Sequence, residues 1–158
     1  MIMTPLGPFC AAQTALGVWR SELGGSVELF LAGLKAAEVQ RDRRALAPVL
    51  AWVAAYFAGE RETFPLGLDL SGGTAFQQAV WQAVLAIPAG QVRTYSELAR
   101  QLGRPGTARA VGAANARNPL PLIVPCHRLV GRDGSLRGYG SGNGLPTKRW
   151  LLAFEGAL

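Results

Sequence analysis

The spacing of apolar residues predicts a mixed α/β fold for the N-terminal part of the chain. Short apolar runs at Ala15–Trp19 and Val27–Leu31, separated by a turn at Gly24–Gly25, predict the two strands of a hairpin. Apolar positions then repeat at helical spacing, which predicts a helix between about Ala45 and Ala58 that ends at Gly59. A small sheet with at least one covering helix is the structure that these patterns favour.

The apolar pattern weakens between residues 59 and 73. This stretch contains a proline and several glycines, and few of its apolar residues are periodic, so it is the best candidate for a linker. We therefore divide the chain into an N-terminal α/β lobe with its linker, residues 1–70, and a C-terminal domain, residues 71–158.

Three helices are predicted at the start of the C-terminal domain. A capping box at Thr74–Gln77 opens a helix that Pro88–Gly90 terminates, and a second capping box at Thr94–Glu97 opens the next. A tight turn at Gly103–Gly106 leads into a helix of small residues, Thr107–Asn115, so the pair has the form of a helix-turn-helix. Small residues suit close approach to a DNA groove, and they equally suit tight packing of two helices, so both interpretations stay open.

The rest of the chain alternates extended and glycine-rich segments before a last helix. Prolines make Asn118–Pro121 extended, and Leu122–Val124 reads as a short buried strand that delivers Cys126 and its neighbours to a turn. Gly131–Gly144 is a glycine-rich loop, and Lys148–Glu155 forms an amphipathic helix.

Composition and charge narrow the class of protein. The chain has 158 residues, 49% of them hydrophobic, which suits one domain or two small lobes with a real core. Of the net charge of +6, residues 1–90 carry six Lys/Arg against seven Asp/Glu, whereas residues 91–158 carry ten against three. A basic C-terminal part suits a polyanionic partner, although a solvated basic surface would have the same composition.

Other classes of protein are disfavoured by what the sequence contains. No apolar run approaches the roughly 20 residues of a membrane span, and the first residues do not resemble a secretory signal, so we expect a cytoplasmic protein without membrane contact. Two cysteines make a disulfide framework unexpected. With Cys10, Cys126 and His127 as its only Cys and His residues, the chain is not expected to bind zinc.

Cys126 is the candidate nucleophile, because a thiol reacts strongly once a nearby base or positive charge favours the thiolate. The chain's only histidine, His127, follows it directly. Adjacent residues on an extended strand point to opposite faces, so His127 reaches the sulfur only if the backbone bends or a water bridges the two. A buried inert thiol is the competing interpretation.

The segment Ile123–Arg128, Ile-Val-Pro-Cys-His-Arg, resembles the acceptor-site motif of the O6-alkylguanine-DNA alkyltransferases. The resemblance covers residues 74–156, and further motifs follow in that family's order and close to its spacing: Thr94–Ala99, Arg109–Gly112, Asn118–Pro121, Gly138–Gly140 and Trp150–Gly156. It implies a ribonuclease H-like N-terminal lobe and a mainly α C-terminal lobe containing the helix-turn-helix.

The resemblance also implies a partner and a DNA-binding face. The partner would be double-stranded DNA containing alkylated bases, bound by a monomer that rotates the damaged base out through the minor groove. Arg109 would be the finger that fills the gap in the duplex. The other residues that the resemblance places at the DNA are Thr94, Ala108, Ala110, Gly112, Ala113 and Arg128.

The chemistry that the resemblance implies is a single, irreversible alkyl transfer to Cys126. His127 would act as a base through a water, Glu155 would orient it, and Tyr95 would donate a proton or hydrogen bond to the departing guanine. Asn118 would support the acceptor turn, and the base pocket would be lined by Pro119, Pro121, Val124 and Tyr139. The substrate is O6-alkylguanine, with O4-alkylthymine left open, and neither a cofactor nor a metal is expected.

Three other functions compete with this interpretation. A non-catalytic relative that binds lesions would lack the thiol that Cys126 supplies. A helix-turn-helix regulator would need a dimerisation element, for which the sequence offers no candidate. A hydrolase using Cys, His and Glu would turn over small esters or amides, whereas an alkyltransferase would stop after one equivalent.

Overall fold

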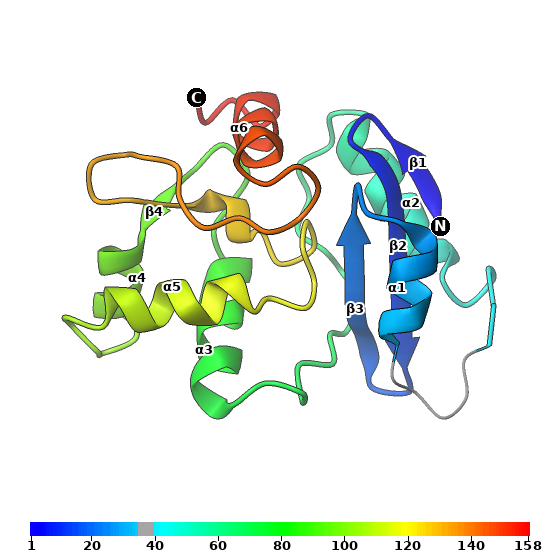
Figure 1. Cartoon of the computed structure of the whole chain (residues 1–158), viewed down its shortest axis with the longest axis horizontal. Helices are drawn as coiled ribbons and strands as arrows, with labels where there is room; N and C mark the ends of the chain where they lie inside the picture. Colours follow the sequence, from blue (N-terminus) through cyan, green and yellow to red (C-terminus); the bar gives the residue numbers. More distant parts are fainter. Residues whose placement is uncertain (35–39) are drawn as a thin grey trace.

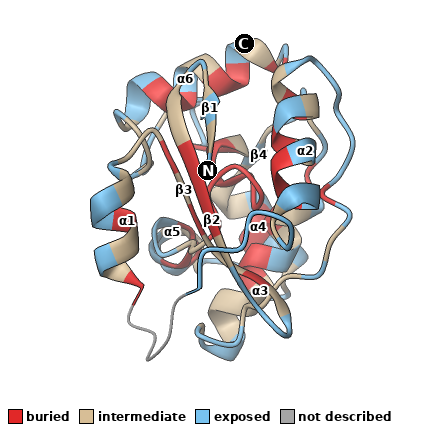
Figure 2. Ribbon diagram, turned by 90° about the vertical axis from the view of Figure 1, so that its right-hand side faces the viewer, coloured by how far each residue is buried: buried red, intermediate tan, exposed pale blue. Residues whose placement is uncertain are grey.

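The N-terminal part of the chain is a three-stranded antiparallel sheet with a helix on each face (Figures 1 and 2). The computed structural model describes residues 1–34 and 40–158. Strands β1 (Ile2–Thr4), β2 (Gly7–Thr14) and β3 (Gly17–Leu23) lie in that order. Alternate residues of β2 face opposite sides, so Phe9 packs in the cluster that includes helix α2 (Ala47–Phe57), while Cys10 packs against helix α1 (Val27–Gly33).

The hairpin lies earlier in the chain than the sequence predicted. Ala15–Leu16 forms the turn between β2 and β3, and the segment Val27–Leu31, expected to be a strand, belongs to α1. Ser26 caps this helix, since its hydroxyl accepts from the backbone N–H of Leu29 at 3.3 Å. The strand prediction was wrong because an apolar run of five residues does not distinguish a strand from a helix.

Helices dominate the C-terminal part of the chain. Its elements are α3 (Ala75–Leu85), β4 (Arg93–Thr94), α4 (Tyr95–Gln101), α5 (Ala108–Ala116), the 3-10 turn η1 (Cys126–Arg128), β5 (Leu129–Val130) and α6 (Leu145–Phe154). Both predicted capping boxes are confirmed, because Thr74 with Gln77 and Thr94 with Glu97 exchange both of the expected hydrogen bonds. Strand β4 pairs in parallel with β5, which anchors the start of α4 beside η1.

The strand predicted at Leu122–Val124 is instead a tight turn. Pro121 and Val124 form an isolated bridge, and Leu122 adopts a positive φ of 74°, which costs a non-glycine residue about 1 kcal/mol. Burial of the Leu122 side chain, which is 2% exposed, offsets that cost. The prediction failed because apolar residues fill a buried turn as readily as a buried strand.

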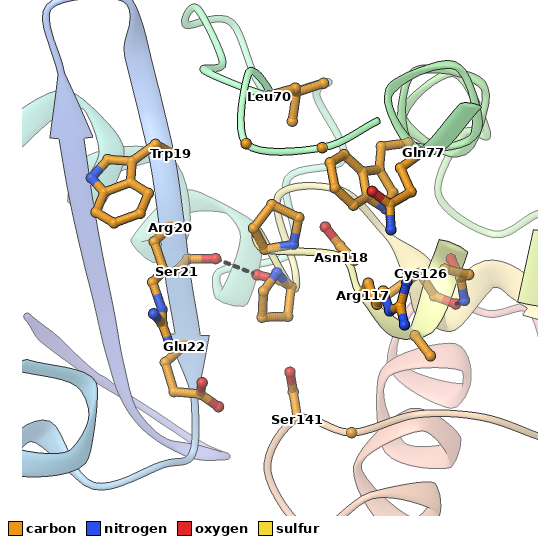
Figure 3. Close-up of a pocket in the computed structure, with 18 of the residues that line it drawn as sticks. Trp19, Arg20, Ser21, Glu22, Leu70, Gln77, Arg117, Asn118, Cys126 and Ser141 are labelled. Carbon is orange, nitrogen blue, oxygen red and sulfur yellow. Dashed lines mark hydrogen bonds between the residues drawn. The ribbon is translucent and has the colours of Figure 1, made fainter. Parts of the chain in front are cut away.

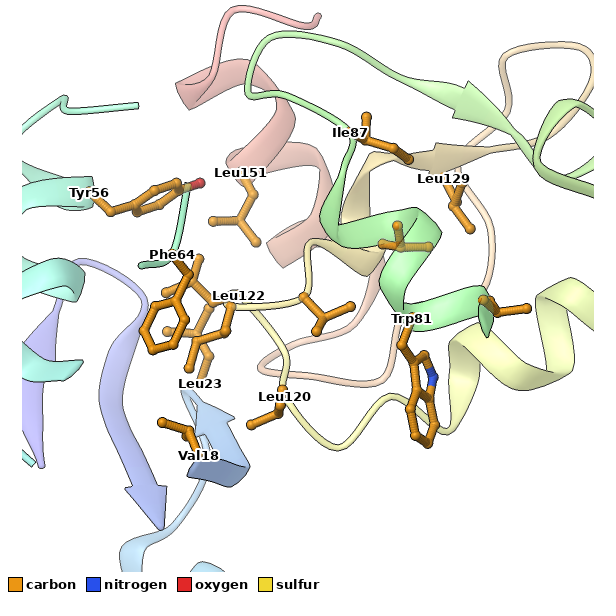
Figure 4. Close-up of a cluster of buried hydrophobic side chains, with 14 of the residues drawn as sticks. Val18, Leu23, Tyr56, Phe64, Trp81, Ile87, Leu120, Leu122, Leu129 and Leu151 are labelled. Atoms are coloured by element: carbon orange, nitrogen blue, oxygen red, sulfur yellow. The ribbon is translucent and has the colours of Figure 1, made fainter. Parts of the chain in front are cut away.

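One apolar core runs through both parts of the chain (Figure 4). Val18 and Leu23 of β3 belong to the same cluster as Leu120, Leu122 and, from α6, Leu151. The sheet edge adds polar contacts, because the backbone N–H of Ser21 donates to the carbonyl of Pro119 at 2.9 Å and the Ser21 hydroxyl donates to that of Pro121 at 2.9 Å. In the described residues, we find no helix with both the length and the apolar character needed to cross a membrane.

Candidate active site

The acceptor turn is built by Asn118 and two prolines. The Asn118 carboxamide accepts from the backbone N–H of Leu120 and donates to the carbonyl of Val124, each at 2.9 Å, and so closes the loop that precedes Cys126. Pro125 then has φ −79° and ψ 64°, the geometry of an inverse γ-turn, and the N–H of Cys126 donates to Val124 at 2.7 Å. The backbone therefore bends sharply just before the cysteine.

The Cys126 thiol is enclosed and protonated at rest. Its residue is 6% exposed, and burial raises the pKa of the thiol above its ordinary value. The Asn118 side chain and the positive charge of Lys148 favour the thiolate without outweighing burial. A reaction at this sulfur consequently needs a group that removes its proton.

His127, the next residue in the sequence, is a titratable group with one ring nitrogen left without a partner among the described residues. The imidazole is fully buried, and its Nε2 lies 2.9 Å from Oε1 of Glu155. Burial lowers the pKa of His127 against the opposing effect of Glu155, so the ring is neutral at pH 7, with Nε2–H donating to the carboxylate. Its Nδ1 has no hydrogen-bond partner in the described part of the chain and is left as an acceptor.

Glu155 is held as a carboxylate by several donors. Arg128 donates from Nε to Oε2 at 2.9 Å and from Nη2 to Oε1 at 2.8 Å, and Tyr56 donates its hydroxyl to Oε1 at 2.7 Å. Burial alone would raise the pKa of Glu155, but the hydrogen bonds from His127 and Arg128 hold it well below its usual range. The carboxylate can thus stabilise a positive charge that develops on His127.

The contacts of Arg128 differ from our expectation that this residue contacts DNA. Besides its two bonds to Glu155, its Nη1 donates to the carbonyl of Ile87, and its side chain is 11% exposed. All three nitrogens of the guanidinium are therefore bonded inside the protein. We correct its role from DNA contact to support of the Glu155 carboxylate.

Lys148 is a site residue that the sequence analysis missed. It is 0% exposed, and its ammonium donates to the backbone carbonyls of Leu129 and Arg137. Burial lowers its pKa from 10.5 to about 8, against the effect of the Cys126 charge. Lys148 lies on the face of α6 that also carries buried Leu151 and Leu152, and Glu155, seven residues later, is the C-cap residue of the helix. Charged residues on a buried helical face were the signal that could have found it.

Two tyrosines lie around the acceptor. The Tyr95 hydroxyl donates to the carbonyl of Arg137 at 3.1 Å, and the Lys148 nitrogen is 6.0 Å from the centre of the Tyr95 ring. Burial raises the pKa of Tyr95, and so does the nearby Cys126 charge, so the phenol remains a proton donor. The Tyr139 hydroxyl is buried without a partner among the described residues, and the ring lies edge-on to His127 with centroids 6.4 Å apart.

Cys126 opens into a cleft of about 830 Å³ between the sheet and the C-terminal helices (Figure 3). Four of the predicted residues line it with Cys126, namely Asn118, Pro119, Pro121 and Tyr139. Strand β3 supplies the opposite wall through Trp19–Glu22, which the sequence analysis did not predict. Two expected residues do not line this cleft: Val124 is buried beneath the turn, and Tyr95 lies close to Gly112 and Gly138.

Helix α5 presents a surface of small residues. Arg109, Ala110 and Ala113 are exposed, and Ala108 and Gly112 are half-buried. Gly112 faces the Tyr95 ring, and a Cβ at this position would be in ordinary van der Waals contact with the ring at 3.8 Å. Thr94 caps α4 through its hydroxyl, which accepts from the N–H of Glu97 at 3.1 Å. On the opposite, buried side of α5, Asn115 donates to the carbonyl of Cys126 at 3.3 Å, a contact the sequence analysis did not predict.

Known proteins resemble the chain in sequence and in structure. Residues 75–157 match the model of the 6-O-methylguanine DNA methyltransferase, DNA binding domain. A methylated-DNA--protein-cysteine methyltransferase of Salmonella typhimurium is 55% identical over 106 residues, which span 67% of this chain and 61% of that protein. The same-named protein of Mycobacterium leprae is 55% identical over 70% of this chain and 66% of its own length.

The structural likeness extends over nearly the whole chain. The crystal structure of Mycobacterium tuberculosis OGT in complex with DNA matches with a TM-score of 0.81 and 41% identity, covering 99% of this chain and 91% of that one. The O6-methylguanine-DNA methyltransferase of Pyrococcus kodakaraensis matches with a TM-score of 0.62 and 25% identity over 90% of this chain and 88% of that one. By the family model, which covers more than half of its length, the chain belongs to the 6-O-methylguanine DNA methyltransferase family.

Proposed function

We propose that this protein repairs alkylated DNA by moving the alkyl group of O6-alkylguanine onto Cys126, once and irreversibly. The observation that carries the proposal is the arrangement around the thiol: a buried Cys126 opens into a cleft, and His127 and Glu155 form a hydrogen-bonded pair beside it. Membership of the family and the names of the relatives support the same chemistry.

His127 activates the nucleophile in this proposal. Its Nδ1 accepts the thiol proton through a bridging water, while Nε2–H remains hydrogen-bonded to Glu155. The imidazolium that forms is therefore paired with a carboxylate. The Cys126 thiolate then attacks the alkyl carbon in line, an S–C bond forms, and the C–O bond to guanine breaks. The electron pair of that bond leaves on the guanine.

Tyr95 and Lys148 stabilise the negative charge that develops during the transfer. The Tyr95 phenol donates its hydrogen bond or proton to the guanine ring as negative charge grows there. The ammonium of Lys148, close to the Tyr95 ring, stabilises negative charge on the phenol and on the sulfur. Asn118 keeps the acceptor turn closed, and Pro119, Pro121 and Tyr139 bound the alkyl group in the cleft.

DNA is proposed to bind along α5, with α4 and α5 acting as a helix-turn-helix. The exposed alanines allow the helix to approach the minor groove closely, and the lesion rotates out of the duplex into the cleft. The exposed Arg109 enters the base stack, where a planar guanidinium stacks and hydrogen-bonds better than an ammonium. Thr94, Ala108, Ala110, Gly112 and Ala113 belong to the same face.

The product is a thioether, which no group in this site can hydrolyse, so each molecule acts once and the alkyl donor is the DNA itself. We further propose that the protein works as a cytoplasmic monomer. The division into a ribonuclease H-like lobe, residues 1–70, and a DNA-binding domain, residues 71–158, belongs to the same proposal.

Mass spectrometry of the intact protein and its peptides tests the activity. After incubation with a duplex containing one O6-methylguanine, we expect the Cys126 peptide to gain one methylene, saturating at one per protein. Cys126→Ser should transfer nothing and still bind the lesion, while Cys10→Ser, which alters the other free cysteine, should react like the wild type. An unchanged mass combined with tight binding of the lesion would support a non-catalytic lesion-binding protein instead.

A further inference from the structure

Tyr56 reaches the site from the N-terminal part of the chain. It lies near the end of α2, is 3% exposed, and donates its hydroxyl to Oε1 of Glu155 at 2.7 Å across 99 residues of sequence. Figure 4 shows its ring pointing from α2 toward α6. None of the roles proposed above for alkyl transfer uses this residue.

The Tyr56 ring is held in a packed aromatic setting. Its centroid lies 5.8 Å from that of Trp52, 5.1 Å from Phe57 and 5.7 Å from Phe154, and the Arg61 guanidinium is 5.5 Å from the ring centre. Burial raises the pKa of Tyr56 far above its ordinary value, and the Glu155 charge acts in the same direction. The hydroxyl therefore stays protonated and is a permanent hydrogen-bond donor.

Glu155 needs such a restraint. It is the C-cap residue of α6, and Arg128 donates to both of its oxygens. His127 bonds only to Oε1, so a rotation of the carboxylate about its last bond would weaken that one contact. Tyr56 pins Oε1, the same oxygen that His127 uses.

We propose that Tyr56 is a positioning residue for alkyl transfer: its hydroxyl fixes the Glu155 carboxylate in the orientation that keeps Nε2–H of His127 bonded and Nδ1 facing the acceptor as base. The N-terminal sheet and its helix thereby take part in the reaction through one hydrogen bond. This inference rests on the proposed function, because it gives Tyr56 a role in positioning His127, the base that the proposed transfer needs.

The matched pair of variants is Tyr56→Phe and Trp52→Phe. Tyr56→Phe removes only the hydroxyl and keeps the ring in its aromatic setting. Trp52→Phe changes the packing of the same helix, including the bond from Trp52 to the carbonyl of Glu62, and does not touch Glu155.

Single-turnover kinetics separates positioning from folding. Since each molecule reacts once, the endpoint counts folded protein and the rate constant reports how well the site is arranged. For Tyr56→Phe on a duplex with O6-methylguanine, we expect an endpoint near one methyl per protein and a rate constant about tenfold lower, as one lost charge-assisted hydrogen bond allows. Trp52→Phe should keep the wild-type rate constant.

Nitrogen NMR of the imidazole gives a second reading that does not depend on activity. The chain contains one histidine, so its ring signals belong to His127. We expect the Nε2–H tautomer in the wild type and in Trp52→Phe, and a mixture of both tautomers in Tyr56→Phe. If the wild type transferred no methyl, the proposed function would fail, while the tautomers would still test whether Tyr56 positions the pair.

Two outcomes would overturn the proposal. One is a Tyr56→Phe protein with the wild-type tautomer and rate constant, even if its endpoint is lower, because Tyr56 would then only support the fold. The other is an equal loss of rate in Trp52→Phe, which would assign the effect to the packing of α2.

Discussion

Replacing Lys148 with methionine removes an ammonium group that the fold encloses completely. The side chain is 0% exposed and donates to two backbone carbonyls, those of Leu129 and Arg137. Methionine has a similar length and no charge, so the variant loses the titration and those two bonds while the packing is nearly kept. The perturbation should therefore appear as a change in how stability depends on pH.

The magnitude follows from the pKa of Lys148. Burial lowers it from 10.5 to about 8 in the folded protein. Between these values the unfolded chain binds one more proton than the folded chain, so this group makes the protein more stable as pH rises. The difference of about 2.5 corresponds to about 3 kcal/mol of unfolding free energy.

Urea denaturation at a series of pH values checks this reasoning. The wild type minus Lys148→Met difference in unfolding free energy should grow by about 3 kcal/mol between pH 7.5 and 10.5. Lys148 and Cys126 influence each other's ionisation, so both proteins also carry Cys126→Ser. The remaining cysteine and the tyrosines ionise in the same range in both, and their effects cancel in the difference. A difference that stays constant over this range would show that burial does not lower the pKa of Lys148.

Two further predictions test the DNA face and the fold. Arg109→Ala should slow transfer from duplex DNA by about ten- to a hundredfold, because the variant loses stacking on the bases, and it should leave the reaction with a free modified base unchanged. Arg43→Ala, which changes another exposed arginine, is the control. Equal losses of rate on both substrates would contradict the finger role of Arg109. Gly17→Ala should lower the unfolding free energy measured by urea denaturation by about 3 kcal/mol, because φ is +139° and a Cβ would lie 2.3 Å from the Gly67 oxygen. Gly72→Ala, where a Cβ would meet nothing within 4 Å, should lower it by less than about 0.5 kcal/mol. Similar losses in the two variants would contradict the prediction.

The elements that the sequence predicted well have strong local signals. The capping boxes at Thr74 and Thr94 fix the starts of α3 and α4 through contacts three residues apart, and periodic apolar positions located α2. Short apolar runs were the failures: Val27–Leu31 became a helix and Leu122–Val124 a turn. In both places the outcome depends on packing against distant segments, which a local pattern does not contain.

The residues of the candidate site divide in the same way, into those with a local sequence signal and those whose position depends on distant segments. Cys126 and His127 are adjacent in sequence, so both could be proposed as site residues together, and Pro125 supplies a bend in the backbone just before them. Tyr56 could not be found this way, because its partner is 99 residues away. Family resemblance gave Arg128 a DNA contact, and only the three-dimensional arrangement places its guanidinium on Glu155.

Two contacts between residues that are far apart in sequence complete the surroundings of Cys126. Ser21 meets Pro121 across 100 residues and Tyr56 meets Glu155 across 99, and contacts so distant in sequence must wait for large loops to close. The wall of the cleft and the contact of Tyr56 with Glu155 are therefore complete only when the first strands and the last helix have come together. Under the proposed single transfer, this makes reaction at Cys126 depend on completion of the fold, so that an incompletely folded molecule does not use up its one reaction.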